Sequence, residues 1–121
     1  MNRLSPIPLA ASALFVCASA FGGDVDHPDC AGADRWPTGM AVVLLRNAGL
    51  LPFDGRKSIR THTTRIASEP LDGGIFRQVH RVVVTTADNE KHDAIVVNEV
   101  SAEECSISPV ELFLIDRHLD R

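Results

Sequence analysis

The stretch from Phe76 to Val100 constrains the fold of this chain more than any other. It holds two runs rich in β-branched residues, Phe76–Thr86 and Lys91–Val100. Such side chains favour the pleated surface of a β-sheet. Between the runs lies Asp88-Asn89, which can supply the positive φ angles of a two-residue turn. The sequence therefore predicts a long antiparallel hairpin at the centre of a small sheet.

A two-residue turn at Asp88-Asn89 also predicts the pairing of the two strands. The expected pairs are Val84 with Asp93, Val82 with Ile95 and His80 with Val97. In this register each face has an apolar middle and polar ends, so we expect a helix to cover one face, and the pattern leaves open which one. A slip of one residue would exchange the faces, because side chains alternate along a strand.

The best helix of the sequence is expected at Trp36–Ala48. Asp34 suits the N-cap, Pro37 falls in the first turn, where its missing N–H costs little, and Gly49 suits the C-terminal end. Apolar residues recur at i, i+4, i+7, i+8 and i+12, which is one face of a helix. This spacing predicts a buried stripe of Trp36, Met40, Val43, Leu44 and Ala48.

Two further strands complete the predicted sheet. Ser58–Ser68 is rich in threonine but polar, which is typical of a sheet edge or a solvent-facing strand. Val110–Asp116 is nearly continuously apolar, which predicts burial on both faces. The expected fold class is α+β, with one N-terminal helix packed on an antiparallel sheet of about four strands.

The first twenty residues, Met1–Ala20, have the pattern of a secretory signal peptide. Arg3 gives a basic start, Leu9–Ala18 is an apolar run, and Ala18-Ser19-Ala20 is a small-residue cleavage pattern. The alternatives are a buried helix, or a lipoprotein whose lipid is attached to Cys17. We therefore expect a periplasmic or secreted protein whose residues 21–121 form a single small domain.

The charge of the remaining chain limits its partners. Without its first twenty residues it keeps eleven Lys and Arg residues against sixteen Asp and Glu residues. This acidic balance argues against nonspecific binding of nucleic acid or of a membrane, and it suits a basic protein partner. After signal cleavage we expect no stable membrane insertion.

Two cysteines, Cys30 and Cys105, remain after cleavage. In an exported protein such a pair predicts a disulfide. The bond would close a loop of about 75 residues and stabilise the fold by about 4 kcal/mol in the chain-entropy description. The alternative is a catalytic thiol at Cys105, but the preceding Glu103-Glu104 would raise its pKa.

The residues that could carry chemistry are histidines, serines and carboxylates. His62, His80 and His92 lie on three predicted strands and are the candidate zinc ligands, although the predicted register puts His80 and His92 on opposite faces. The serines considered as nucleophiles do not lie in a Gly-x-Ser-x-Gly turn; they are Ser101, Ser106 and Ser108. The adjacent Glu103-Glu104 is interpreted as a solvated pair in a polar loop, and not as the two carboxylates of a glycosidase. His27-Pro28-Asp29-Cys30 is interpreted as a loop before the disulfide. We assign no catalytic, cofactor-binding or metal-binding residue.

Basic residues gather in the middle of the chain, at Arg56, Lys57, Arg60, Arg65, Arg77 and Arg81. An arginine-rich sheet face suits an acidic partner or an anionic cell-wall or lipid headgroup. The simpler interpretation is a solvated polar face.

The order of parts resembles the colicin M immunity protein and the small exported proteins related to it. The matching features are Cys30, the helix Trp36–Ala48, Cys105 and the strand Val110–Asp116. The resemblance implies a periplasmic protein with one helix on a four-stranded sheet and a single disulfide. It provides no motif that matches residue by residue, and the cleavable signal expected for this chain differs from the retained anchor of those proteins.

These observations favour an exported, non-enzymatic protein-binding module, of the inhibitor or immunity type, whose partner is a hydrolase or a toxin. One alternative is a small periplasmic enzyme or metal-binding protein that uses the sheet histidines. Another is a structural module accessory to the cell envelope. The sequence does not indicate which surface binds the partner.

Overall fold

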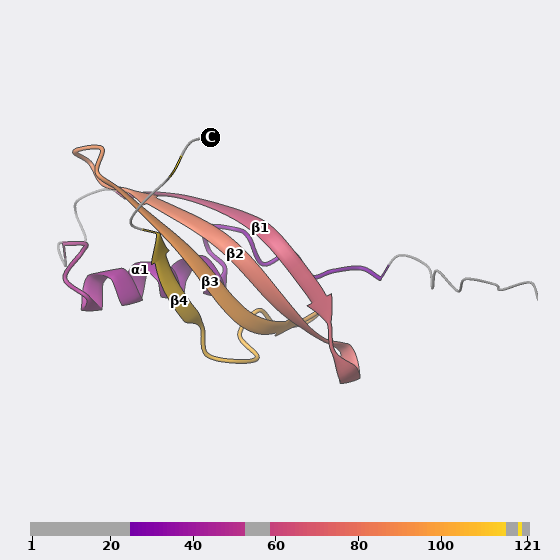
Figure 1. Cartoon of the computed structure of the whole chain (residues 1–121). Coiled ribbons are helices and arrows are strands. Elements are labelled where there is room, and N and C mark those ends of the chain that lie inside the picture. Colours follow the sequence, from indigo (N-terminus) through magenta and orange to yellow (C-terminus); the bar gives the residue numbers. More distant parts are fainter. Residues whose placement is uncertain (1–24, 53–58, 116–118, 120–121) are drawn as a thin grey trace, which may run out of the picture.

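The structure, a computed structural model, describes residues 25–52, 59–115 and 119. These residues form α1 (Trp36–Asn47), β1 (Arg60–Pro70), the short 3-10 turn η1 (Asp72–Gly74), β2 (Ile75–Thr85), β3 (Lys91–Ser101) and β4 (Glu111–Ile115). The strands make one antiparallel sheet in the order β1-β2-β3-β4, and α1 lies against one face of it (Figure 1). The predicted α+β fold is confirmed. The predicted signal peptide with Cys17, the Arg56-Lys57 pair and most of the charged tail lie outside the described residues.

The two faces of the sheet differ in what covers them. We name the face that carries α1 the inner face and the opposite one the outer face. Alternate residues of the two central strands are buried on the inner face: Phe76, Gln78, His80, Val82 and Val84 of β2, and Ala94, Val96, Asn98 and Val100 of β3.

The register of the central hairpin differs by one residue from the predicted one. Val84 pairs with His92, Val82 with Ala94 and His80 with Val96. The cause is the turn, which has three residues instead of two. The Thr86 N–H donates to the Glu90 carbonyl at 2.9 Å, the Asn89 N–H donates to the Thr86 carbonyl at 3.0 Å, and Asn89 has a φ of 62°. A turn followed by one left-handed residue is a common three-residue hairpin loop.

The helix also presents a different face from the predicted one. Its buried residues are Pro37, Thr38, Ala41 and Leu45, whereas Trp36 and Val43 of the predicted stripe are 40% and 42% exposed. The six residues from Met40 to Leu45 are all apolar, so they form more than one possible stripe. The stripe that is buried is the one that contacts the inner face of the sheet.

The end of α1 agrees with the sequence. The Leu50 N–H donates to the Leu45 carbonyl and the Gly49 N–H to the Arg46 carbonyl, both at 2.9 Å, and Gly49 has a φ of 76°. This pair of bonds is the Schellman motif, in which glycine takes the left-handed position without a steric penalty. The N-terminal end differs, because Arg35 and not Asp34 stands at the N-cap, and it makes no side-chain cap.

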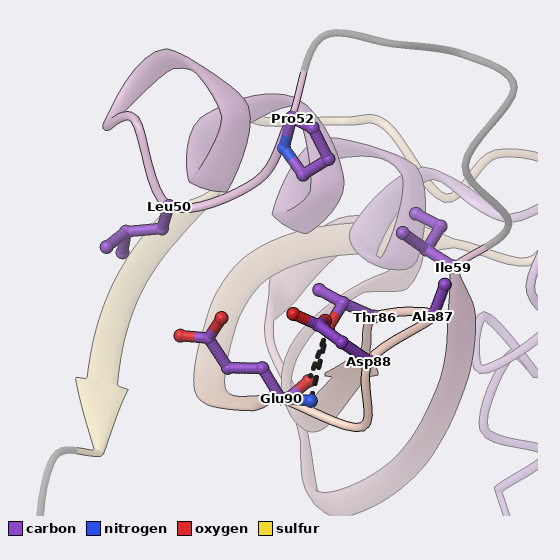
Figure 2. Close-up of a pocket in the computed structure, with 7 residues that line it drawn as sticks. All are labelled: Leu50, Pro52, Ile59, Thr86, Ala87, Asp88 and Glu90. Atoms are coloured by element: carbon purple, nitrogen blue, oxygen red, sulfur yellow. Dashed lines mark hydrogen bonds between the residues drawn. The ribbon is translucent and has the colours of Figure 1, made fainter.

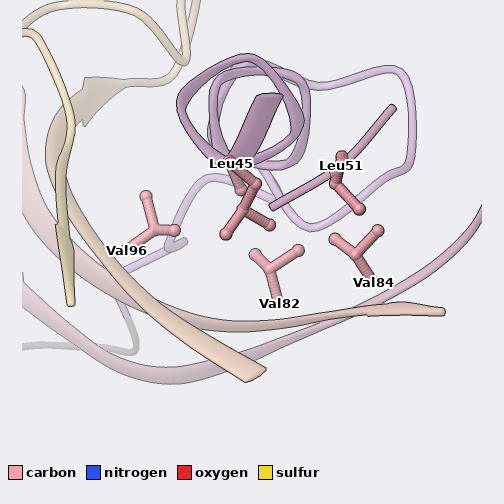
Figure 3. Close-up of a cluster of buried hydrophobic side chains, with 6 residues drawn as sticks. Leu45, Leu51, Val82, Val84 and Val96 are labelled. Carbon is pink, nitrogen blue, oxygen red and sulfur yellow. The ribbon is translucent and has the colours of Figure 1, made fainter. Parts of the chain in front are cut away.

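The main hydrophobic core lies between α1 and the central strands. Figure 3 shows Leu45 and Leu51 directed toward Val82, Val84 and Val96 of the sheet. Ala41 completes this buried cluster, and Leu112 of β4 packs at its border. The core therefore occupies the half of the inner face nearer the β2–β3 turn.

The disulfide organises the other half of the inner face. Cys30 and Cys105 are bonded as predicted, with their Cα atoms 5.7 Å apart, and Cys30 is fully buried beside Phe76 and Val100. The segment before α1 crosses this half of the sheet. There the Pro28 carbonyl accepts hydrogen bonds from Gln78 Nε2 at 2.8 Å and from an Arg65 guanidinium nitrogen at 3.1 Å.

Candidate functional site

The three candidate histidines do not gather in one site. His62 lies on β1 opposite Val83, on the outer face, while His80 and His92 both lie on the inner face. The prediction that the latter two fall on opposite faces is wrong, because the register is shifted by one residue. His80 stands opposite Val96, which is four residues from His92 along β3. The two histidines are therefore separated by roughly 13 Å along the strand direction, at the usual rise of a strand. Among the described residues no group of three or more His, Cys, Asp or Glu side chains is placed to hold a metal ion.

The candidate serines take structural roles in the segment after β3. Ser108 Oγ accepts the Glu99 N–H at 2.8 Å, and Ser101 Oγ accepts the Glu104 N–H at 3.2 Å. Ser106 Oγ donates to Glu104 Oε1 at 2.7 Å. Within the described residues these hydroxyls bond to turn atoms and acidic side chains and to no histidine. A serine needs a base to become a nucleophile, so the arrangement does not favour hydrolysis.

The candidate loop around Asp29 and His27 is likewise part of the scaffold. His27 Nδ1 lies 2.6 Å from Ser68 Oγ, and its ring meets Phe76 edge to face with centroids 5.1 Å apart. Asp29 Oδ1 accepts the Ala31 N–H at 3.2 Å. These contacts hold the segment before α1 against β1 and β2.

His80 is the most unusual polar residue of the inner face. It is fully buried, and neither ring nitrogen has a hydrogen-bond partner within the described residues. Arg65 stands opposite it on β1, Val96 stands opposite it on β3, and Asp29 is the nearby acid. Burial lowers the pKa of His80 below the ordinary 6.5, the charge of Arg65 lowers it further, and Asp29 partly offsets both. His80 is therefore neutral at pH 7.

We expect this buried imidazole to make the fold sensitive to acid. The folded pKa lies below the unfolded value of 6.5, so above that pH neither state is protonated at His80 and its contribution to stability is constant. Below that pH the unfolded state takes up the proton first, and the free energy of unfolding falls. Urea unfolding at about pH 7.5 and about pH 5.5 should show a lower midpoint in acid, with a smaller difference in His80→Leu. Equal differences in both proteins would show that His80 is not the cause.

A hollow of about 360 Å³ lies between the residues that follow α1 and the β2–β3 turn (Figure 2). Apolar residues make up much of its lining, and Asp88 and Glu90 add two carboxylates; the apolar residues are Leu50, Pro52, Ile59 and Ala87. The hydroxyl of Thr86 donates to Asp88 and accepts the Glu90 N–H, so it is held within the turn. Its described lining residues include no histidine, cysteine or lysine, and the geometry fits an apolar contact better than a reaction.

The outer face of the sheet is left open by the other described elements. In Figure 1 neither the helix nor the segment before it crosses this face. Its partly exposed apolar residues are Val79 and Val83 of β2 and Ile95 and Val97 of β3, with Arg81 between the two β2 valines and opposite Ile95. Phe113, opposite Ile95, extends this area onto β4 and is 56% exposed. Neighbouring apolar side chains that remain accessible on a sheet face are a feature of interaction sites.

The arginines of this region do not form a free cationic face. On the outer face Arg81 makes a two-pronged ion pair with Asp93, with Nε 3.0 Å from Oδ1, and Arg77 lies 3.7 Å from Glu99. Arg60 donates to Asn89 Oδ1 at 3.1 Å. The interpretation as an arginine-rich docking face for an anion therefore loses support. Hydrogen bonding to Asp93 also raises the pKa of Arg81 above its ordinary value.

The last strand is placed differently from the prediction. The sequence predicts burial on both faces, but in the part of the chain that the structure describes β4 is an edge strand that pairs with β3 alone. Phe113, Leu114 and Ile115 are 56%, 48% and 39% exposed. Phe113 and Ile115 lie on the outer face, opposite Ile95 and Asp93, whereas Leu114 lies on the inner face, opposite Ala94. The apolar run predicts a core strand, but such a run does not distinguish a central strand from an edge strand.

No protein family, curated protein or solved structure matches this chain in comparisons of sequence and fold. Within the described part of the chain, no helix is long and apolar enough to span a bilayer.

Proposed function

We propose that this protein is exported and acts without catalysis, by binding another protein through the outer face of its sheet. The observation that carries the proposal is a group of partly or largely exposed apolar side chains that crosses three strands of the outer face, Val79, Val97, Ile95 and Phe113. It lies between the Arg77–Glu99 ion pair on one side and the Arg81–Asp93 ion pair on the other. An apolar centre within a polar rim is the usual anatomy of a protein interface.

Further features support the proposal. The Cys30–Cys105 disulfide is typical of proteins from oxidising compartments, in keeping with the signal-like start of the chain. The histidines and serines considered for catalysis lie apart or hold turns, which favours binding over an enzymatic role. The layout resembles that of colicin M immunity protein. On these grounds the partner is a hydrolase or a toxin, and the protein acts as its inhibitor.

Replacing Phe113 with serine should strongly reduce capture of the partner. The oxidised protein would be used to capture partners from the periplasmic extract of its own cells, followed by mass spectrometry. We expect a stoichiometric partner on the wild type and at least about tenfold less on Phe113→Ser, because a large aromatic side chain that becomes buried in an interface is a typical hot spot. Inhibition of the captured protein's activity would then separate an inhibitor from a structural module.

The matched control is Ile66→Ser. Ile66 lies at the bulge in β1 and is 56% exposed, the same fraction as Phe113. The Ile66→Ser variant should still capture the partner as well as the wild type does. Equal losses in both variants would locate binding elsewhere, and capture of no partner by the wild type would count against the proposed function.

A further inference from the structure

We propose that the free edge of β4 accepts an extended segment of the partner as a fifth, antiparallel strand of the sheet. The segment is apolar on both faces and ends in a lysine or arginine that reaches Glu111. This inference rests on the proposed protein-binding function and specifies the chemistry of its partner.

The backbone of β4 supplies the first reason. In an antiparallel pair, alternate residues direct their N–H and C=O groups toward the neighbour, and the residues between them direct theirs away. Among the described residues β4 pairs with β3 alone, which leaves the backbone groups on its far side available to another strand. Main-chain bonds of this kind provide affinity in β-strand addition.

The side chains of β4 supply the second reason, by contrast with the other edge of the same sheet. β1 is protected in the ways usual for edge strands, because it has a bulge at Ile66 and carries Arg60, Arg65, Glu69 and Pro70. β4 has four consecutive apolar residues, Leu112 to Ile115, and three of them are more than a third exposed. A run of this kind on an open edge indicates that something covers it.

The charge at the start of β4 identifies the occupant. Glu111 is exposed, and the ion pairs found among the described residues do not include it. With Glu99 and Arg77 it lines a hollow of about 560 Å³ beside β4, where Arg77 is already paired with Glu99. A cationic residue of the partner would therefore meet an unneutralised carboxylate.

A second copy of this chain fits the edge less well. If β4 paired antiparallel with itself about Phe113, each Glu111 would stand opposite Ile115 of the other copy, and neither carboxylate would gain a cation. The net charge of the chain, −4, also opposes self-association. In an antiparallel fifth strand the residue opposite Glu111 follows the apolar run, so the expected partner segment has apolar residues and then Lys or Arg.

Labelled peptides test this inference directly. The first probe is Ser-Thr-Val-Ile-Val-Lys, the second has Glu in place of Lys, and two more carry N-methyl groups on alternate backbone amides, one set for each edge of the strand. Fluorescence anisotropy gives the affinities, and amide hydrogen exchange shows where each peptide binds. We expect the first probe to slow exchange in residues 111–115, and at least one N-methylated probe to bind at least about tenfold more weakly, because methylation removes donors from one edge.

Reversing the charge of residue 111 distinguishes strand addition at β4 from nonspecific peptide binding. Glu111→Lys should bind the Lys peptide several-fold more weakly than wild type and should bind the Glu peptide more tightly. Equal binding of all four peptides, or no binding up to about 1 mM, would overturn the inference. Sedimentation of the free protein as a dimer that Leu114→Lys dissociates would also overturn it, in favour of a second copy. If no peptide binds while the Phe113→Ser capture experiment succeeds, strand addition is wrong and the proposed function stands.

Discussion

Replacing Cys30 and Cys105 together with alanine is expected to lower the free energy of unfolding by about 4 kcal/mol. The bond joins residues 75 positions apart, and it ties the segment before α1 to the segment between β3 and β4. Without it the unfolded chain gains the freedom of a long open loop. A domain of this size has only about 5–15 kcal/mol in total, so the loss is a large share of its stability.

Urea unfolding of the oxidised protein and of the double-alanine variant measures this difference. The same variant also loses the packing of Cys30, which is fully buried against Phe76 and Val100. Wild type unfolded with a reductant present is therefore the matched control, since it keeps the sulfur atoms and loses only the bond. If reduction lowers the free energy of unfolding by less than about 1 kcal/mol, loop closure by the disulfide is not a major source of stability in the oxidised protein.

Leu45→Ala is expected to lower the free energy of unfolding by about 3 kcal/mol, within the range of about 2–5 kcal/mol usual for buried leucines. Leu45 is 1% exposed and fills the space between α1 and the valines of β2 and β3. Its removal leaves a cavity that a sheet of β-branched residues cannot easily close, because their side chains have few alternative rotamers. Chemical denaturation followed by circular dichroism gives the value.

Val43→Ala is the control that tests which side of α1 faces the sheet. Val43 belongs to the stripe that the sequence predicts as buried, but it is 42% exposed. Its replacement should change stability by less than about 0.5 kcal/mol, because alanine is the better helix former at an exposed position. If Val43→Ala cost as much as Leu45→Ala, the helix would face the sheet with the predicted stripe and the observed rotation would be wrong.

Sequence patterns alone identified most of the elements of the fold. β-branched runs marked β2 and β3, and the glycine after the helix marked its end, because these signals act within a few residues of the backbone. The disulfide followed from the number of cysteines and the signal-like start. The candidate site was only partly predictable, since the apolar residues of β4 were recognised but their exposure was not.

Relations between elements were decided by the tertiary structure. The hairpin register depended on one extra turn residue, with Thr86 and Glu90 bonded around it, and this slip placed Asp93 and Ile95 on the outer face. The side of α1 that is buried depended on where the sheet lay, since the helix is apolar around most of its circumference. The exposure of β4 depended on its place at the end of the strand order. In each case the alternatives have similar local energies, and contacts with residues distant in sequence decide between them.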